Sequence, residues 1–159
     1  MASRLRRILA GVLTALVLTG CSSGFPRDPE GTLDRVRGGE LRVGVSESPP
    51  WTEVPDDGHP TGPEVELVED FAESIDADVA WTSGSESHLV RSLDGGDLDL
   101  VVGGLTEQSP WQSHAALTNP YTEVETPDGR TEKLVMAARL GENGFLTELE
   151  SFFVAREEQ

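Results

Sequence analysis

The chain has 159 residues, of which 29 are acidic and 12 are basic, so its formal net charge is −17. So acidic a chain repels the phosphates of nucleic acids and of anionic lipid headgroups, which excludes both as partners. Cys21 is the single cysteine, which excludes a disulfide bond within the chain.

The first 20 residues have the pattern of an export signal. Arg4, Arg6 and Arg7 precede an apolar run from Ile8 to Leu18, which is too short to cross a bilayer as a stable helix. Small residues then lead into Cys21, and this arrangement resembles the lipobox of bacterial lipoproteins. The resemblance implies that Cys21 becomes the mature N-terminus and carries acyl chains such as palmitate. The alternative is an ordinary secretory signal followed by an unpaired thiol.

Removal of residues 1–20 leaves 139 residues with nine basic and 29 acidic side chains, a net charge of −20. This length is enough for one domain with a modest core. Residues 21–38 are rich in small and helix-breaking types and predict a flexible tether, with one helical turn from Thr32 to Arg37. The domain itself is predicted over residues 39–159. We expect an exported protein, anchored to the cell membrane through lipid on Cys21 and facing the periplasm or the exterior.

Three strands are predicted in the first half of the domain. Alternating apolar residues indicate a strand from Glu40 to Val45, and a shorter strand follows from Val79 to Trp81. The run from Leu98 to Val102 is almost wholly apolar, as is typical of a central parallel strand that is covered on both faces. Helical segments separate the three strands, which predicts a parallel sheet with right-handed crossovers.

The helices and the last strand complete an α/β fold with a mostly parallel sheet flanked by helices. Pro63 suits the first turn of a helix whose apolar face continues to Ile75. Ser85 can cap a second helix, which Gly95-Gly96 ends. Leu134 to Ala138 is interpreted as another buried strand. The apolar stripe of a final amphipathic helix consists of Phe145, Leu146, Leu149, Phe152 and Phe153.

Short segments of the domain, in the same order and register, resemble one known family. They are Gly39–Val45, Pro49–Trp51, Gly62–Leu67, Gly103–Thr106 and Leu117–Tyr121. Over residues 39–121 the chain is similar to the bacterial extracellular solute-binding proteins of family 3, the binding components of polar amino-acid ABC transporters. The resemblance implies a lobe of the periplasmic-binding-protein type that binds a small polar solute without catalysis.

Two loops that follow predicted strands carry the candidate binding site. Trp51 follows the first strand, and Gly103, Gly104 and Thr106 follow the third, so both loops are expected at the carboxyl edge of the sheet. An aromatic face and backbone N–H groups would meet there and suit an amino acid or an amine. The alternatives are rim packing for Trp51, turn formation for the glycines and a simple capping role for Thr106.

The chain departs from the family at Trp111. The resemblance implies that an arginine at this position grips the α-carboxylate of an amino acid, which a neutral indole cannot do. Ser109-Pro110 could instead start a helix whose N-terminus accepts a carboxylate. Trp111 and Tyr121 are candidate aromatic walls of the site, and plain packing is the alternative for Trp111.

A second departure concerns the number of lobes. The resemblance implies a two-lobed clamshell, in which the chain crosses to the second lobe after the proline-tyrosine pair. Here 12 residues separate Tyr121 from Leu134, and the turn residues Thr126–Arg130 predict a hairpin between them. We therefore expect about one lobe. Because polar contacts on an open lobe contribute about 0.5–1.5 kcal/mol each, we expect weak binding unless a partner surface completes the site.

Other chemistry is not indicated. His59, His88 and His114 lack the spacing of a zinc site, and no nucleophile motif or phosphate-binding loop is found. We expect no enzyme, no metal and no cofactor. The predicted function is that of a solute-binding lipoprotein that presents a small polar solute to an ABC permease or receptor. The alternative is a protein–protein interaction or sensor module derived from a solute-binding lobe that no longer serves transport.

Overall fold

The computed structural model describes residues 27–56, 59–126 and 128–157. The predicted export signal (1–20) and Cys21 lie outside these residues. Within the described part of the chain, no helix has the length and apolar character needed to cross a membrane.

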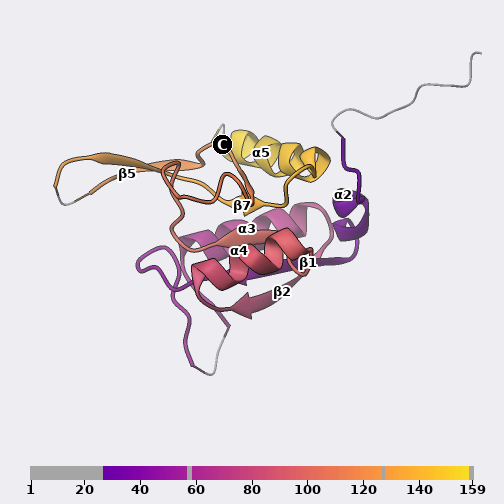
Figure 1. The fold of residues 1–159 in the computed structure, drawn as a ribbon, viewed down its shortest axis with the longest axis horizontal. Helices are drawn as coiled ribbons and strands as arrows, with labels where there is room; N and C mark the ends of the chain where they lie inside the picture. Colours follow the sequence, from indigo (N-terminus) through magenta and orange to yellow (C-terminus); the bar gives the residue numbers. More distant parts are fainter. Residues whose placement is uncertain (1–26, 57–58, 127, 158–159) are drawn as a thin grey trace, which may run out of the picture.

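A five-stranded sheet forms the centre of the fold, with the strand order β2-β1-β3-β7-β4 (Figure 1). β1 runs parallel to both β2 and β3, whereas β7 runs antiparallel to β3 and to β4. The predicted mostly parallel sheet is therefore confirmed. Its strands are β1 (Glu40–Val45), β2 (Asp78–Ser83), β3 (Leu100–Val102), β4 (Ala116–Leu117) and β7 (Ala137–Ala138).

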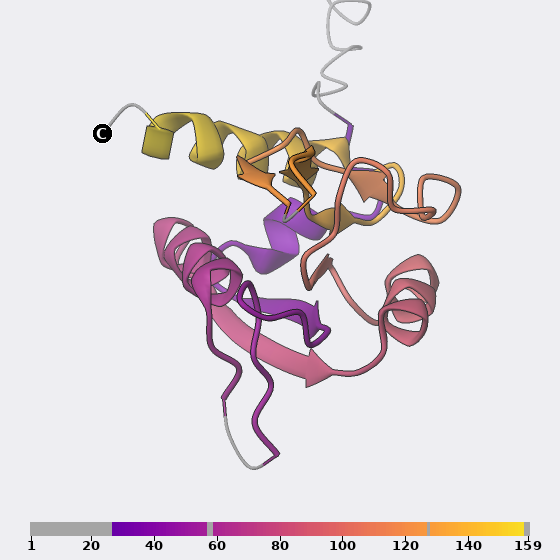
Figure 2. The ribbon, with the colours of Figure 1, turned by 90° about the vertical axis from the view of Figure 1, so that its left-hand side faces the viewer.

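Helices cover both faces of this sheet (Figure 2). α3 (Pro63–Ser74) and α5 (Asn143–Glu157) share one hydrophobic cluster with the inward residues of β1, whereas α4 (Glu86–Gly95) packs into a second cluster. The strand β3 contributes to both clusters, since Leu100 and Val102 face α3 and α5 while Val101 faces α4. This two-sided burial explains why the sequence of β3 is apolar without alternation.

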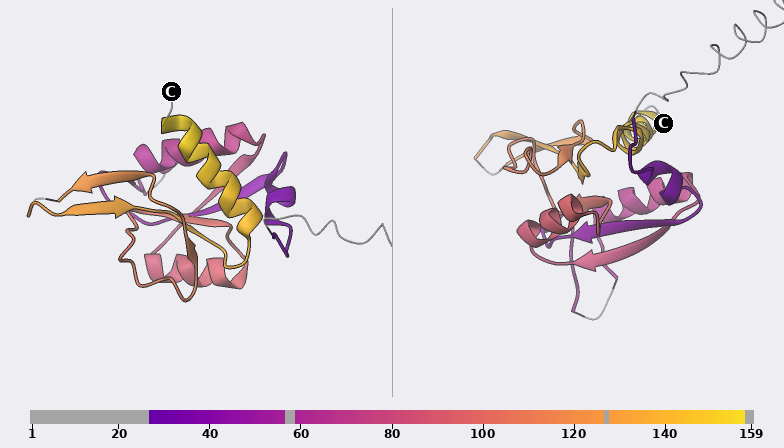
Figure 3. Two further views of the ribbon diagram at one scale, coloured as in Figure 1. Left: turned by 90° about the horizontal axis from the view of Figure 1, so that it is seen from above. Right: turned by 45° about the vertical axis from the view of Figure 1, so that its right-hand side comes forward.

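A hairpin of β5 (Thr122–Glu125) and β6 (Thr131–Leu134) extends from the sheet as predicted (Figures 1 and 3). The prediction of one strand from Leu134 to Ala138 was wrong, because the chain passes there from the hairpin to the main sheet. Between β6 and β7, the Val135 N–H donates to the Leu105 carbonyl and the Met136 N–H to Thr118 Oγ1. Two short strands in different sheets therefore replace the single strand.

The packed domain begins earlier than residue 39, which corrects the predicted extent of the tether. α2 (Thr32–Val36) buries Thr32 and Val36, and Val36 belongs to the main hydrophobic cluster. The buried Glu142, just before α5, accepts hydrogen bonds from the N–H groups of Glu30 and Thr32, each at 3.1 Å. The segment before β1 is thus fastened to the start of α5.

Candidate functional site

Trp51 and Gly104 lie side by side at the carboxyl edge of the sheet, as the sequence predicted. A Cβ atom on Gly104 would lie 3.3 Å from Cδ1 of the indole. The backbone of Trp51 is held on both sides, since its N–H donates to the Ser48 carbonyl at 2.8 Å and its carbonyl accepts the Glu64 N–H at 3.2 Å. The start of α3 therefore fixes the position of this aromatic residue.

The turn after β3 requires glycine at two consecutive positions. Gly103 and Gly104 have φ angles of 145° and 68°, in the region that residues with a side chain rarely adopt. A Cβ on Gly103 would overlap Ser46, and a Cβ on Gly104 would overlap Ser48. Close approach of the two loops explains these glycines.

Glu64 connects this turn to the hairpin, and no pattern in the sequence had indicated this role. Its side chain is fully buried, and its carboxylate accepts hydrogen bonds from the Gly104 N–H at 2.8 Å and from the Tyr121 hydroxyl at 2.6 Å. Burial raises the pKa of Glu64, although these hydrogen bonds and one from the Gly103 N–H oppose the shift. The Gly104 N–H, proposed as a donor to a solute, is therefore already engaged.

The other predicted site residues, Tyr121, Thr106 and Trp111, differ in their position relative to Glu64 and the glycine turn. Tyr121 lies on the α3 side, where burial and the nearby Glu64 carboxylate raise the pKa of its hydroxyl. The Thr106 N–H donates to Ser109 Oγ at 3.1 Å. Trp111 packs against the cluster on the α4 side and its indole N–H donates to Glu86. The structure brings Trp51, Gly104 and Tyr121 together through Glu64, and it places Trp111 on the other face of the sheet.

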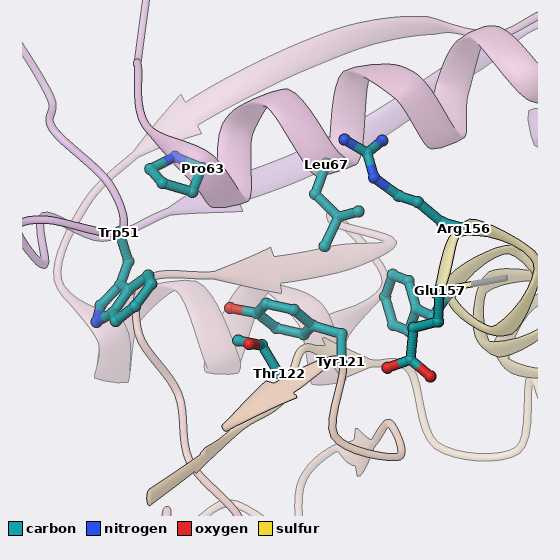
Figure 4. Close-up of a pocket in the computed structure, with 8 residues that line it drawn as sticks. Trp51, Pro63, Leu67, Tyr121, Thr122, Arg156 and Glu157 are labelled. Atoms are coloured by element: carbon teal, nitrogen blue, oxygen red, sulfur yellow. The ribbon is translucent and has the colours of Figure 1, made fainter. Parts of the chain in front are cut away.

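A pocket of about 320 Å³ opens between Trp51, α3, the base of the hairpin and the last turn of α5 (Figure 4). Trp51 and Tyr121 form two of its walls, and Leu67 and Phe153 contribute apolar surface. Arg156 is the basic residue that lines it, and Glu157 lies beside it on the same helix. The α5 residues were not predicted to line a site, because the apolar stripe of this helix indicates only core packing.

The described residues hold no cluster of three or more His, Cys, Asp or Glu side chains that could bind a metal ion. His59 instead lies 2.5 Å from a Glu69 carboxylate oxygen, and His114 lies 3.4 Å from one of Asp94. All four side chains are largely exposed, so these contacts are surface pairs.

Comparison of the sequence with known proteins gives one family and one group of relatives. The model of the bacterial extracellular solute-binding proteins, family 3, matches residues 41–133, which is more than half of the chain. The L-cystine-binding protein TcyJ of Escherichia coli (strain K12) is 29% identical over 119 residues. These residues are 74% of this chain but 44% of TcyJ, so the chain spans less than half the length of this relative.

Solved structures show the same fold. The arginine-bound form of domain 1 from TmArgBP has a TM-score of 0.67 and 23% sequence identity, over 77% of this chain and 97% of that domain. The L-cystine solute receptor of Neisseria gonorrhoeae, in its unliganded open conformation, has a TM-score of 0.67 and 12% identity, over 80% of this chain and 91% of that one. The predicted periplasmic-binding-protein-like lobe is confirmed.

Proposed function

Because this chain belongs to the bacterial extracellular solute-binding proteins of family 3, we propose that it binds a small polar solute and presents it to an ABC permease or receptor. The family is one of binding proteins, which agrees with the prediction that the chain is not an enzyme. The proposed solute is an amino acid or an amine, in line with relatives described as binding cystine or arginine.

The observation that carries this proposal is the position of Trp51 against the Gly103-Gly104 turn, next to the pocket that Tyr121 also lines. Ligands of open α/β sheets bind beyond the carboxyl ends of the strands, since loops from several strands converge there. The arginine-bound state of an isolated domain 1 from TmArgBP supports binding by one lobe. Because the carboxyl edge of this one lobe stays open to water, we expect dissociation constants above the micromolar range.

Replacement of Trp51 by leucine is expected to weaken solute binding about fivefold, because an aromatic contact contributes about 1 kcal/mol beyond area alone. Two-dimensional NMR titration of the monomer with a panel of amino acids and amines measures such weak affinities. Trp111→Leu is the matched variant, and because Trp111 packs on the α4 side it should leave the affinity unchanged. Equal affinities of wild type and Trp51→Leu would contradict the proposed site, and sub-micromolar binding by the monomer would contradict the expected weakness.

We further propose that Cys21 carries lipid and holds the domain at the membrane surface. Several acyl chains on one residue give firm anchoring, since each buried methylene contributes about 0.8 kcal/mol. Cys21→Ala should therefore move the protein from the membrane fraction to the soluble fraction, whereas Ser22→Ala should not. Retention of Cys21→Ala in washed membranes, or an unmodified mass for the N-terminal peptide, would refute the anchor.

The second candidate function, a protein-interaction or sensor module, is favoured by the hairpin that extends freely where a clamshell would cross to its second lobe (Figure 3). Native mass spectrometry and thermal-shift screens separate the two functions. A thermal shift with small solutes on the monomer supports solute binding. A stable complex with another protein, with no shift for any solute, supports the module.

A further inference from the structure

The pocket beside Trp51 combines apolar walls with a charged end. Tyr121 and Phe153 pack against each other with ring centroids 5.6 Å apart. Leu67 of α3 also lines the pocket, above Tyr121 in the view of Figure 4. Leu67 and Phe153 are almost fully buried, so this surface is preformed. Its volume of about 320 Å³ is at the small end of ligand pockets and suits a molecule of amino-acid size.

The charged end is formed by Arg156 and Glu157, in the last turn of α5. The Arg156 side chain extends toward α3, where it pairs with Asp70, and the Glu157 carboxylate points to the opposite side of the pocket mouth (Figure 4). A guanidinium has five N–H donors in a planar fork, and Asp70 is the one hydrogen-bond partner of Arg156 among the described residues. Donors remain for the carboxylate of a ligand.

We propose that this pocket binds the zwitterionic form of an amino acid with an apolar side chain. The ligand carboxylate pairs with Arg156, the ammonium faces Glu157, and the side chain lies between Trp51 and Tyr121. Trp111 stands where the family resemblance implies an arginine, and its indole N–H donates to Glu86, so this position offers a carboxylate no cation. This inference rests on the proposed solute-binding function and specifies where the solute lies and which charges it carries.

Three ligands that differ only in their head groups test the proposal: L-phenylalanine, L-phenylalaninamide and N-acetyl-L-phenylalanine. NMR titration of the wild-type protein should give the highest affinity for L-phenylalanine, with losses of about tenfold when either charge is removed. In Arg156→Gln, L-phenylalanine should weaken to the affinity of the amide, so the preference for a free carboxylate disappears. In Glu157→Gln, the preference for a free ammonium should disappear instead.

Arg37→Gln is the matched control, since Arg37 has the same exposed fraction of 49% as Arg156 and pairs with a glutamate of α5. It removes one positive charge without touching the pocket and should leave all three affinities unchanged. An Arg156→Gln variant that still prefers L-phenylalanine to its amide would overturn the inference while leaving solute binding at Trp51 intact. If none of the three ligands shifts the Trp51 indole signal but another solute does, the inference alone fails. If no solute shifts it, the proposed function fails as well.

Discussion

Replacement of Glu64 by alanine is expected to lower the free energy of unfolding by roughly 3–5 kcal/mol, the largest effect we expect of any single substitution in the site. The carboxylate is fully buried, and its loss leaves the Gly104 N–H and the Tyr121 hydroxyl without their acceptor. Each buried polar group that loses its partner costs about 1–3 kcal/mol, and the vacated volume adds a cavity term. Urea unfolding followed by circular dichroism measures the change.

Glu64→Gln is the isosteric control for this substitution. The amide keeps an oxygen that can accept the Gly104 N–H, and its own N–H can donate to the Tyr121 hydroxyl oxygen. We therefore expect the glutamine variant to retain most of the wild-type stability. A glutamine variant as unstable as the alanine variant would show that these hydrogen bonds are not what Glu64 contributes.

A comparison of the wild type with Glu64→Gln over a range of pH reports the ionisation of Glu64. Burial raises the pKa of Glu64 above its ordinary value of 4.5, so the folded protein keeps this proton at pH values where the unfolded chain has released it. The stability that arises from protonation is therefore fully present below pH 4.5 and is lost as the pH rises through the folded-state pKa. Across this window the wild type should lose stability relative to Glu64→Gln, and parallel stability curves would refute the raised pKa.

Replacement of Asp99 by alanine is expected to cost about 3 kcal/mol, through a different network. Asp99 is fully buried at the amino end of β3, where it accepts hydrogen bonds from the Arg42 N–H at 3.0 Å and from Arg42 Nη2 at 2.7 Å. Arg35 pairs with the same carboxylate. Because both arginines are partly exposed, water replaces part of the lost interaction, which keeps the cost at the lower end of the range for broken buried ion pairs.

Asp97→Ala is the matched control for Asp99, because Asp97 is an exposed aspartate two positions earlier. Its removal changes the net charge by the same amount and should alter the free energy of unfolding by no more than about 0.5 kcal/mol. Urea unfolding at two ionic strengths measures the difference in unfolding free energy between Asp99→Ala and Asp97→Ala. Equal costs for the two substitutions would mean that the loss reflects net charge and not the buried network.

The alternation of strands and helices up to Val102 was predictable because each element carries a local pattern, which is an uninterrupted apolar run in β3 and a periodic apolar face in the others. The juxtaposition of Trp51 and Gly104 was also predictable, since it follows from parallel strands whose carboxyl ends share an edge. The role of Glu64 was not, because an acidic residue in the first turn of a helix is normally explained by the helix dipole. Its partners Gly104 and Tyr121 lie 40 and 57 residues away, and no local pattern links them.

Contacts between residues far apart in the sequence also determine where the domain begins and how its last strands are formed. Residues 28–38 have the composition of a linker, yet the carboxylates of Asp28 and Glu142 join them to α5 across more than 100 residues. Likewise, Leu134 to Ala138 is uniformly apolar, and only the tertiary structure shows where the chain leaves one sheet and enters another. Sequence patterns thus indicate burial better than they indicate which partner provides it.

The fastening of the N-terminal segment to α5 has a mechanical consequence. Under the proposed anchoring, the six peptide units from Cys21 to Arg27 can span at most about 22 Å. The domain would therefore lie close to the surface of the bilayer. A force transmitted from the lipid through these residues would act on the start of α5, because Asp28 and Glu30 are hydrogen-bonded there. The hairpin, in contrast, projects from the end of the molecule opposite α2 (Figures 1 and 3). The lipid attachment would therefore limit the orientations of the domain relative to the membrane, and the hairpin would remain far from the point where the lipid is attached.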